Sequence, residues 1–224
     1  MTKYYQNQFT LPGKISVILF DLDGVLVDAC DWHFVALNKA LRDIADIEIS
    51  RQDHEKKYNG LPTKVKLEML GIDDETSKKI WKTKQDLTLG IIKKNSCPAY
   101  DKIYLHDVLK ENSIKIGCVT NSIRETSEAM LKSTSQYDFI DLLITNEDVE
   151  NNKPSPDCYD LAVQKFGVDP KNVLIVEDSD KGFEAATASV VPNIWKVDNC
   201  KEVNYKNFKG VIYEYFNTHG RRRK

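Results

Sequence analysis

Five short segments of the chain are rich in β-branched and apolar residues. They span residues 15–20, 114–119, 142–145, 173–176 and 193–197. Nearly continuous apolar runs of this length are typical of strands in a parallel sheet that is covered on both faces. Helical patterns separate most of these runs, for example over residues 122–132, 157–166 and 180–188. The sequence therefore predicts an α/β fold with a doubly wound parallel sheet.

One long gap interrupts this alternation. Between residues 28 and 96 no good strand pattern is present, and apolar residues such as Trp32, Val35 and Ala36 recur at helical spacing instead. We therefore expect an all-α helical insertion over residues 28–96, between the first two strands. The core domain is expected to comprise residues 1–27 and 97–224.

Composition and charge argue against several classes of function. The chain has 224 residues, of which 41% are hydrophobic and 29% are charged, as in ordinary globular proteins. A formal net charge of −2 gives no general attraction to nucleic acid or to a membrane surface. The apolar runs are shorter than the roughly 18 residues of a spanning helix, and residues 1–14 lack the apolar core of a signal peptide.

The scattered cysteines suggest a cytoplasmic protein, and the basic end of the chain is a separate feature. Five cysteines are scattered and never occur in C-x-x-C spacing, so we expect reduced thiols in a reducing cytoplasm. The segment RRRK at residues 221–224 is expected to be a solvated tail rather than a nucleic-acid contact.

Acids, a hydroxyl and a lysine follow four of the predicted strands. They are Asp21 and Asp23 after the first strand, Thr120 after the second, Lys153 in the loop after the third, and Glu177 and Asp178 after the fourth. The carboxyl ends of strands in an open parallel sheet meet at one edge, where ligands bind. The sequence therefore predicts that these side chains form a single site.

The residue types indicate the chemistry of that site. Carboxylates that lie close together repel one another, and a hard cation such as Mg²⁺ is the ion that oxygen ligands suit best. One carboxylate could then act as a nucleophile through an aspartyl-phosphate, while a second holds a proton for the leaving oxygen. Lys153 and Thr120 could bind the phosphoryl oxygens, where charge spreads in the transition state.

Four motifs resemble those of the haloacid dehalogenase-like superfamily of phosphotransferases. The segment DLDGVLVD at residues 21–28 fits the first motif, D-x-D-G-x-[IVL]-x-D, throughout. Thr120 ends an apolar strand, Lys153 precedes a proline in NKPSP, and Glu177 and Asp178 begin an E-D-S motif. The resemblance covers about residues 15–198 and implies a Rossmann-like core with an α-helical cap.

The resemblance also implies roles for individual residues. Asp21 is expected to be the nucleophile and Asp23 the general acid and base, with the main-chain carbonyl of Asp23 on Mg²⁺. The expected phosphate-binding residues are Thr120, Asn121 and Lys153, and the expected metal ligands are Asp21, Asp23, Glu177 and Asp178. The insertion is expected to close over the site and exclude water.

Within the superfamily, the insertion is most similar to the β-phosphoglucomutase and phosphoglycolate-phosphatase-like branch. His33 stands where mutase-like members place a histidine that assists the acid–base aspartate, and Lys84 matches a lysine of a later cap helix. Ser122 and Arg124 are further candidates for contact with the substrate. The remaining histidines, His54, His106 and His219, show no metal-ligand spacing and are expected at the surface.

Three functions remain open at this stage. The preferred one is a Mg²⁺-dependent phosphatase of a small phosphorylated metabolite, such as a sugar phosphate. The second is a phosphomutase, in which a substrate hydroxyl replaces water. The third is a catalytically idle interaction protein on the same fold. The sequence does not identify the substrate or the oligomeric state.

Overall fold

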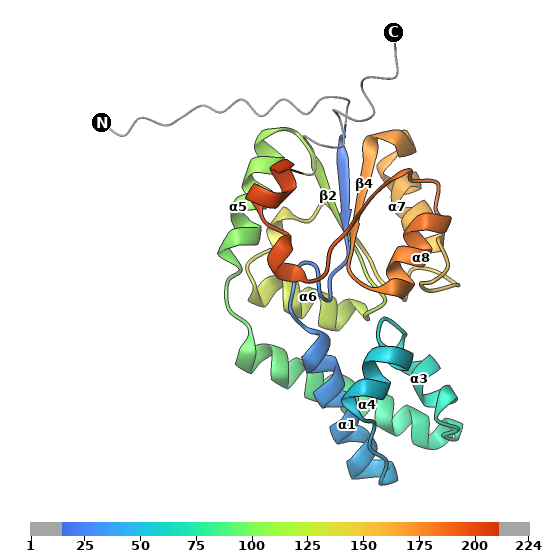
Figure 1. The fold of residues 1–224 in the computed structure, drawn as a ribbon. Helices are drawn as coiled ribbons and strands as arrows, with labels where there is room; N and C mark the ends of the chain where they lie inside the picture. Colours follow the sequence, from blue (N-terminus) through green and yellow to red (C-terminus); the bar gives the residue numbers. More distant parts are fainter. Residues whose placement is uncertain (1–14, 211–224) are drawn as a thin grey trace.

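The computed structural model describes residues 15–210 and contains a five-stranded parallel sheet (Figure 1). The strands are β1 (Val17–Phe20), β2 (Lys115–Val119), β3 (Leu142–Ile144), β4 (Val173–Glu177) and β5 (Asn193–Lys196). Their order across the sheet is β3-β2-β1-β4-β5, so β1 is central and the winding direction changes beside it. The predicted strands and the doubly wound α/β fold are confirmed.

Four helices cover the two faces of the sheet. They are α5 (Tyr100–Glu111), α6 (Arg124–Ser133), α7 (Asp157–Phe166) and α8 (Asp180–Ala188). Alternate side chains of a strand point to opposite faces. Accordingly, Ile18 and Phe20 of β1 pack in a buried cluster with residues of α5 and α6. Val17 and Leu19 pack on the other face with residues of α7 and α8. A strand that is buried on both faces explains why its sequence is continuously apolar.

The segment between β1 and α5 is predominantly helical, as expected. It contains α1 (Cys30–Ala45), α2 (Arg51–Asp53), the π-helical turn η1 (His54–Tyr58), α3 (Thr63–Met69) and α4 (Asp74–Asn95). Leu37, Leu41 and Ile80 belong to a buried apolar cluster that this segment forms by itself. In Figure 1 these helices lie beyond the carboxyl ends of the strands, where the predicted site residues gather. The division of the chain into two domains at residues 28 and 97 stays a prediction.

Local sequence signals set several helix ends. The carboxylate of Asp73 accepts hydrogen bonds from the backbone N–H groups of Glu75 and Thr76 and begins α4. Helix α7 ends at Gly167, which has a left-handed φ of 64°. Single 3-10 turns lie at η2 (Tyr137–Phe139), η3 (Pro170–Asn172) and η4 (Cys200–Glu202), and residues 205–210 are helical at the end of the described range.

Some predictions fall outside the described residues. These concern residues 1–14, His219 and the basic residues 221–224. Within residues 15–210, no helix is both long and apolar enough to cross a bilayer.

The prediction that His54 and His106 lie at the surface is wrong. His106 is fully buried in α5, where its ring meets Phe20 edge-on and its Nε2 lies 3.1 Å from Oε1 of Gln136. The partner is 30 residues away in sequence, so no local pattern reveals it. Burial lowers the pKa of His106 to about 4. His54 is buried as well, beside the pocket described below.

We expect His106 to make the fold sensitive to acid. Its imidazole takes up a proton near pH 6.5 in the unfolded chain but only near pH 4 in the folded protein, because its pKa falls to about 4 on burial. The unfolded state binds more protons between these values, so the free energy of unfolding falls by roughly 3 kcal/mol as the pH drops through this window. His106→Gln should therefore show a smaller difference in urea-unfolding free energy between pH 7 and pH 4 than the unsubstituted protein. An equal difference in both proteins would contradict this account.

Candidate active site

A buried lysine joins the strand ends at the carboxyl edge of the sheet. The Nζ of Lys153 donates hydrogen bonds to Oδ1 of Asp21 at 2.7 Å, to Oε1 of Glu177 at 2.6 Å and to the carbonyl oxygen of Val119 at 2.8 Å. The hydroxyl of Tyr159 in α7 donates to the same Oε1 of Glu177 at 2.6 Å. Burial disfavours the charge of Lys153, but the two carboxylates outweigh it and raise the pKa of Lys153 well above its ordinary value.

Asp21, Glu177 and Asp178 form an acidic cluster whose oxygen atoms lie within 4.8 Å of one another. Burial and the neighbouring carboxylates raise the pKa of Asp21 well above its ordinary value, although Lys153 opposes this. Burial and Glu177 raise the pKa of Asp178 to about 7. The single positive charge of Lys153 therefore does not offset the burial and mutual repulsion of these carboxylates.

The surroundings of Asp178 fit a divalent cation. Its Oδ1 is buried and has no hydrogen-bond partner among the described residues. The chain comes very close to its carboxylate at Gly24, where a Cβ would lie 2.1 Å from Oδ2 of Asp178. Gly24 also has a φ of 88°, which other residues rarely adopt. A carboxylate cluster with an unpartnered oxygen suits Mg²⁺, and Asp21 and Asp178 are the residues best placed to hold it.

Glu177, the third member of this cluster, has hydrogen-bond partners for both of its carboxylate oxygens. Its Oε1 accepts from Lys153 and Tyr159, and its Oε2 lies 3.2 Å from the backbone N–H of Asp178. A Cβ at Gly182 would lie 2.0 Å from Oε1 of Glu177, so a glycine there makes room for the carboxylate. Both carboxylate oxygens of Glu177 therefore have hydrogen-bond donors. Its carboxylate holds Lys153 in place and is also a member of the acidic cluster.

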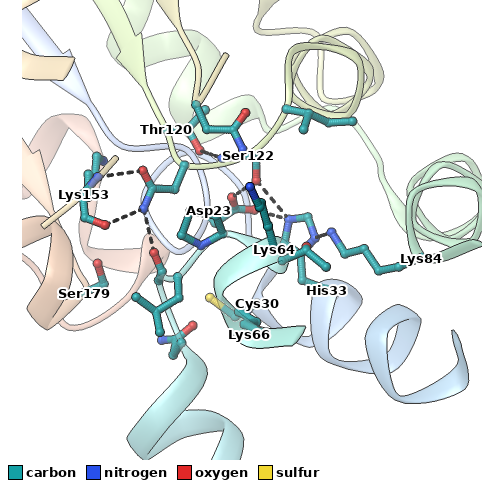
Figure 2. Close-up of a pocket in the computed structure, with 18 of the residues that line it drawn as sticks. Asp23, Cys30, His33, Lys64, Lys66, Lys84, Thr120, Ser122, Lys153 and Ser179 are labelled. Carbon is teal, nitrogen blue, oxygen red and sulfur yellow. Dashed lines mark hydrogen bonds and ion pairs between the residues drawn. The ribbon is translucent and has the colours of Figure 1, made fainter. Parts of the chain in front are cut away.

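A second set of contacts holds Asp23 from both sides (Figure 2). Nε2 of His33 in α1 lies 2.9 Å from Oδ1 of Asp23, and the hydroxyl of Ser122 donates to Oδ2 at 2.8 Å. Nζ of Lys84 in α4 lies 3.0 Å from Nδ1 of His33 and 3.4 Å from Oε1 of Gln85. Since Lys84 donates to Nδ1, these partners assign the ring proton of a neutral His33 to Nε2, which then donates to Asp23.

These contacts favour the ionised form of Asp23. Burial raises its pKa, but the electrostatic attraction to His33 and the hydrogen bonds from His33 and Ser122 outweigh burial and lower the pKa of Asp23 to about 2. Burial and the positive charge of Lys84 lower the pKa of His33. The pKa values of Asp21 and Asp23 therefore shift in opposite directions, although the two residues are only two positions apart. Asp21 lies in the acidic cluster, whereas Asp23 faces hydrogen-bond donors.

Thr120 and Asn121 follow β2 at the same edge. Oγ1 of Thr120 is buried and accepts a hydrogen bond from the backbone N–H of Ser122 at 3.0 Å. The side chain of Asn121 donates to the carbonyl oxygens of Gly60 at 2.8 Å and Lys153 at 3.1 Å, and accepts from the N–H of Lys153. The Asn121 side chain is therefore engaged by protein groups, and its role in phosphate binding stays a prediction.

Arg124 does not reach the site. Its Nη2 binds both carboxylate oxygens of Asp148, at 2.9 Å and 2.7 Å, and lies 3.4 Å from the carbonyl oxygen of Leu143. Arg124 is also absent from the residues that line the pocket. It follows Thr120 closely in sequence, but the start of α6 directs its side chain toward the loop after β3.

Apart from Glu177, which is fully buried and does not line it, the other predicted site residues surround one cavity of about 110 Å³, below the roughly 300–1,000 Å³ of typical ligand pockets. Those that line it are Asp21, Asp23, His33, Lys84, Thr120, Asn121, Ser122, Lys153 and Asp178. Sequence reasoning missed three neighbours: Tyr159, which holds Glu177, and the pocket-lining Lys66 and His54. Nothing in the sequence singles them out, because helical periodicity predicts only that such positions face inward or outward.

The sequence profile of the family described as haloacid dehalogenase-like hydrolase matches residues 18–196. The match spans more than half of the chain, and the protein belongs to this family, as the four motifs predicted. A phosphorylated carbohydrates phosphatase of Thermotoga maritima is 24% identical over 190 residues, which cover 82% of this chain and 85% of that protein. A phosphoglycolate phosphatase of Aquifex aeolicus is 29% identical over 171 residues, which cover 75% and 78% of the two chains.

Solved structures show the same fold. The crystal structure of β-phosphoglucomutase from Clostridium difficile has a TM-score of 0.75 with 21% sequence identity, and the alignment covers 91% of this chain and 99% of that one. At this level of sequence identity, the similarity shows a shared fold, including the helical segment between the first two strands.

We expect the close approach at Gly24 to be essential for metal binding. In Gly24→Ala the added Cβ would collide with Asp178, so we expect Mg²⁺ affinity to fall by about 10- to 100-fold in a calorimetric titration. Gly71→Ala is the matched control, because Gly71 also has a positive φ of 70° but no described atom within 4 Å of an added Cβ. That control should lose only about 1–2 kcal/mol of stability. Equal losses of Mg²⁺ affinity in both variants would contradict the role of Gly24.

Proposed function

We propose that this protein is a Mg²⁺-dependent phosphatase that hydrolyses a small phosphorylated metabolite through a phospho-aspartate. One observation carries the proposal: residues from four strand ends, 132 positions apart between Asp21 and Lys153, share one buried pocket. Two carboxylates with contrasting surroundings face that pocket, as a nucleophile and an acid–base pair require. The named relatives act on phosphorylated carbohydrates and phosphoglycolate, which supports the same reaction type.

The first step forms the covalent intermediate. A carboxylate oxygen of Asp21 attacks phosphorus, the bond from phosphorus to the ester oxygen breaks, and the leaving oxygen takes a proton from Asp23. The hydrogen bonds from His33 and Ser122 stabilise the charged form of Asp23. A leaving group that displaces either donor raises the pKa of Asp23 toward the range where it carries a proton.

The second step releases phosphate. Water loses a proton to Asp23 and attacks phosphorus, and the bond between phosphorus and Asp21 breaks to restore the carboxylate. The low pKa of Asp23, about 2, leaves it in the ionised form that this step uses. Lys84 supports this arrangement indirectly, because it donates to His33 and so presents the Nε2 proton of His33 to Asp23.

Phosphoryl oxygens would meet Thr120, Lys153 and the backbone N–H of Asn121. When bound, Mg²⁺ supplies positive charge that offsets the acidic cluster and polarises the phosphoryl group. Asp21 and Asp178 would hold the ion, together with the main-chain carbonyl of Asp23 and support from Glu177. A cation beside Asp21 would lower the pKa of Asp21, so that its carboxylate is ionised and available for attack.

The helical segment of residues 28–96 would act as a cap over this site. It has an apolar cluster of its own, as a unit that moves separately requires. The carbonyl oxygen of Gly60 accepts a hydrogen bond from Asn121 at 2.8 Å, and His33 reaches Asp23 from α1. Each of these contacts joins the cap to a residue of the core pocket.

A phosphomutase is the second candidate. It is favoured by the placement of His33 against Asp23 and of Lys84 against His33, since a cap that delivers these groups also controls which acceptor reaches the phospho-aspartate. A catalytically idle interaction protein is less compatible with the buried contacts of Lys153 and Asp21.

The central test is a screen of phosphorylated metabolites with Mg²⁺ for release of inorganic phosphate. We expect the unsubstituted protein to release phosphate, and Asp21→Asn to reduce kcat by at least about 1,000-fold, because an amide is a far weaker nucleophile. Asp180→Asn is the matched control, since the Asp180 side chain is exposed and bound to Lys196. Unchanged turnover in Asp21→Asn would refute the proposed nucleophile.

The same reactions separate phosphatase from phosphomutase. A phosphatase releases one inorganic phosphate for each substrate consumed, whereas a mutase returns an isomeric sugar phosphate and little free phosphate. We expect release of phosphate to match substrate consumption when both are followed by phosphorus NMR. Accumulation of an isomer instead would favour the second candidate.

A further inference from the structure

Lys66 of α3 is a buried cation without a partner. Only 7% of its surface is exposed, it lines the pocket, and its ammonium makes no hydrogen bond or ion pair with any residue in the range 15–210. Lysines are almost never this buried unless they are paired, because removing a charge from water is unfavourable. Burial lowers the pKa of Lys66 to about 8, while Asp23 and Cys30 favour its charge.

Lys84 is a second buried cation in the same wall of the pocket. It is 6% exposed, and its hydrogen-bond partners are the uncharged groups of His33 and Gln85 rather than a carboxylate. Burial and repulsion from Lys66 lower the pKa of Lys84 to about 7. Two buried lysines that repel each other therefore line the same pocket, and neither forms an ion pair with a carboxylate of the described residues, which destabilises the protein unless something else supplies the negative charge.

His54 adds an unpartnered polar atom to this wall. The residue is 5% exposed and lines the pocket, and its buried Nε2 has no hydrogen-bond partner among the described residues. Burial and then Lys66 lower the pKa of His54 to about 4, so the ring is neutral. A neutral imidazole can donate to, or accept from, an oxygen atom of a ligand.

The position of these three residues relates them to the leaving group. Asp23 is the carboxylate that raises the pKa of both Lys66 and Lys84, so both lysines lie on the cap side of Asp23. On the phosphoryl side of the pocket, Lys153 already lies between Asp21 and Glu177. Under the proposed function, Asp23 exchanges a proton with the leaving oxygen. Groups on the cap side of Asp23 therefore face the part of the substrate that leaves.

We propose that the substrate carries a second anionic group on its leaving part, a carboxylate or a second phosphoryl group, which Lys66 and Lys84 bind with help from His54. This inference rests on the proposed function for the direction of the substrate. The small cavity, about 110 Å³, favours a short link between the ester oxygen and the second anion. Lys66 is then the residue that selects a charged leaving group over a neutral one.

Binding to an inactive variant tests this selection directly. In Asp21→Asn with Mg²⁺, calorimetry compares 2-phosphoglycolate with 2-hydroxyethyl phosphate, which has the same chain length and a hydroxyl in place of the carboxylate. Ethylene glycol bisphosphate forms the third arm and reports on a second phosphoryl group. We expect one or both doubly anionic compounds to bind roughly 10- to 100-fold more tightly than the neutral-ended one, as for hydrogen bonds to charged groups.

Substitution of Lys66 then assigns the preference. On the Asp21→Asn background, Lys66→Met should remove most of the preference for the anionic compounds and leave the affinity for 2-hydroxyethyl phosphate within a few-fold. Lys66→Arg should retain part of the preference. Lys82→Met is the matched control, because Lys82 is an exposed lysine of α4 outside the pocket and its loss should change neither affinity.

The same variant has a structural readout. Lys66→Met replaces an unpaired buried charge with an apolar side chain of similar length, so we expect a folded protein with an equal or higher Tm. Equal binding of the charged and neutral compounds by the Asp21→Asn protein would overturn the inference. An equal loss of affinity for both compounds in Lys66→Met would overturn it too, because Lys66 would then act only through Asp23.

The turnover experiment tests the proposed function, and the binding experiment tests the second anionic group separately. If no phosphate ester is hydrolysed, the proposed function is wrong, but the comparison of charged and neutral ligands still decides whether Lys66 and Lys84 bind an anion. If neutral-ended esters are hydrolysed as well as doubly anionic ones, the phosphatase stands and the selection by Lys66 is wrong.

Discussion

The buried ammonium of Lys153 is the interaction on which the rest of the site depends. It follows β3 in the chain and donates to Asp21 after β1, to the carbonyl oxygen of Val119 in β2 and to Glu177 at the end of β4. One side chain thus connects four neighbouring strands at their carboxyl ends. Without it, Asp21 and Glu177 would be two buried carboxylates side by side, which a protein interior does not tolerate. The same constraint explains why Tyr159 donates to Glu177 and why glycines lie beside Glu177 and Asp178 of the cluster.

The pocket has walls of opposite charge, and Asp23 lies between them. The sheet edge supplies the acidic cluster, whereas the helical segment supplies Lys66 and Lys84. The charged groups of each wall are destabilised by burial and by their neighbours. The pKa of Asp21 is raised, and the pKa values of Lys66 and Lys84 are lowered. A cation at one wall and an anion at the other would relieve both. These opposite imbalances of charge are the physical basis for both proposed ligands, a divalent metal ion and a substrate that is negatively charged at both ends.

Much of the fold and of the site could be predicted from the sequence. Strands buried on both faces need continuously apolar segments, so their positions were visible without any tertiary information. The residues after them were also predictable, because parallel strands bring their carboxyl ends together whatever the loops do. The errors concern side chains whose partners are remote. His106 is paired with Gln136 inside the core, and Arg124 is paired with Asp148 rather than with a ligand. Lys66 looked like any helix lysine, because burial of a single polar residue depends on which helices pack around it.

The sequence by itself determined the α/β architecture, the helical insertion and the identity of the residues at the sheet edge, because these follow from local apolar patterning and from chain order. Only the tertiary structure decided how two aspartates that are two positions apart acquire different protonation behaviour. Asp21 lies against other acids, and Asp23 lies against His33 and Ser122, which come from segments 10 and 99 residues away. Electrostatic interactions depend on distance through space and on burial, and neither quantity is written in the order of residues along a chain.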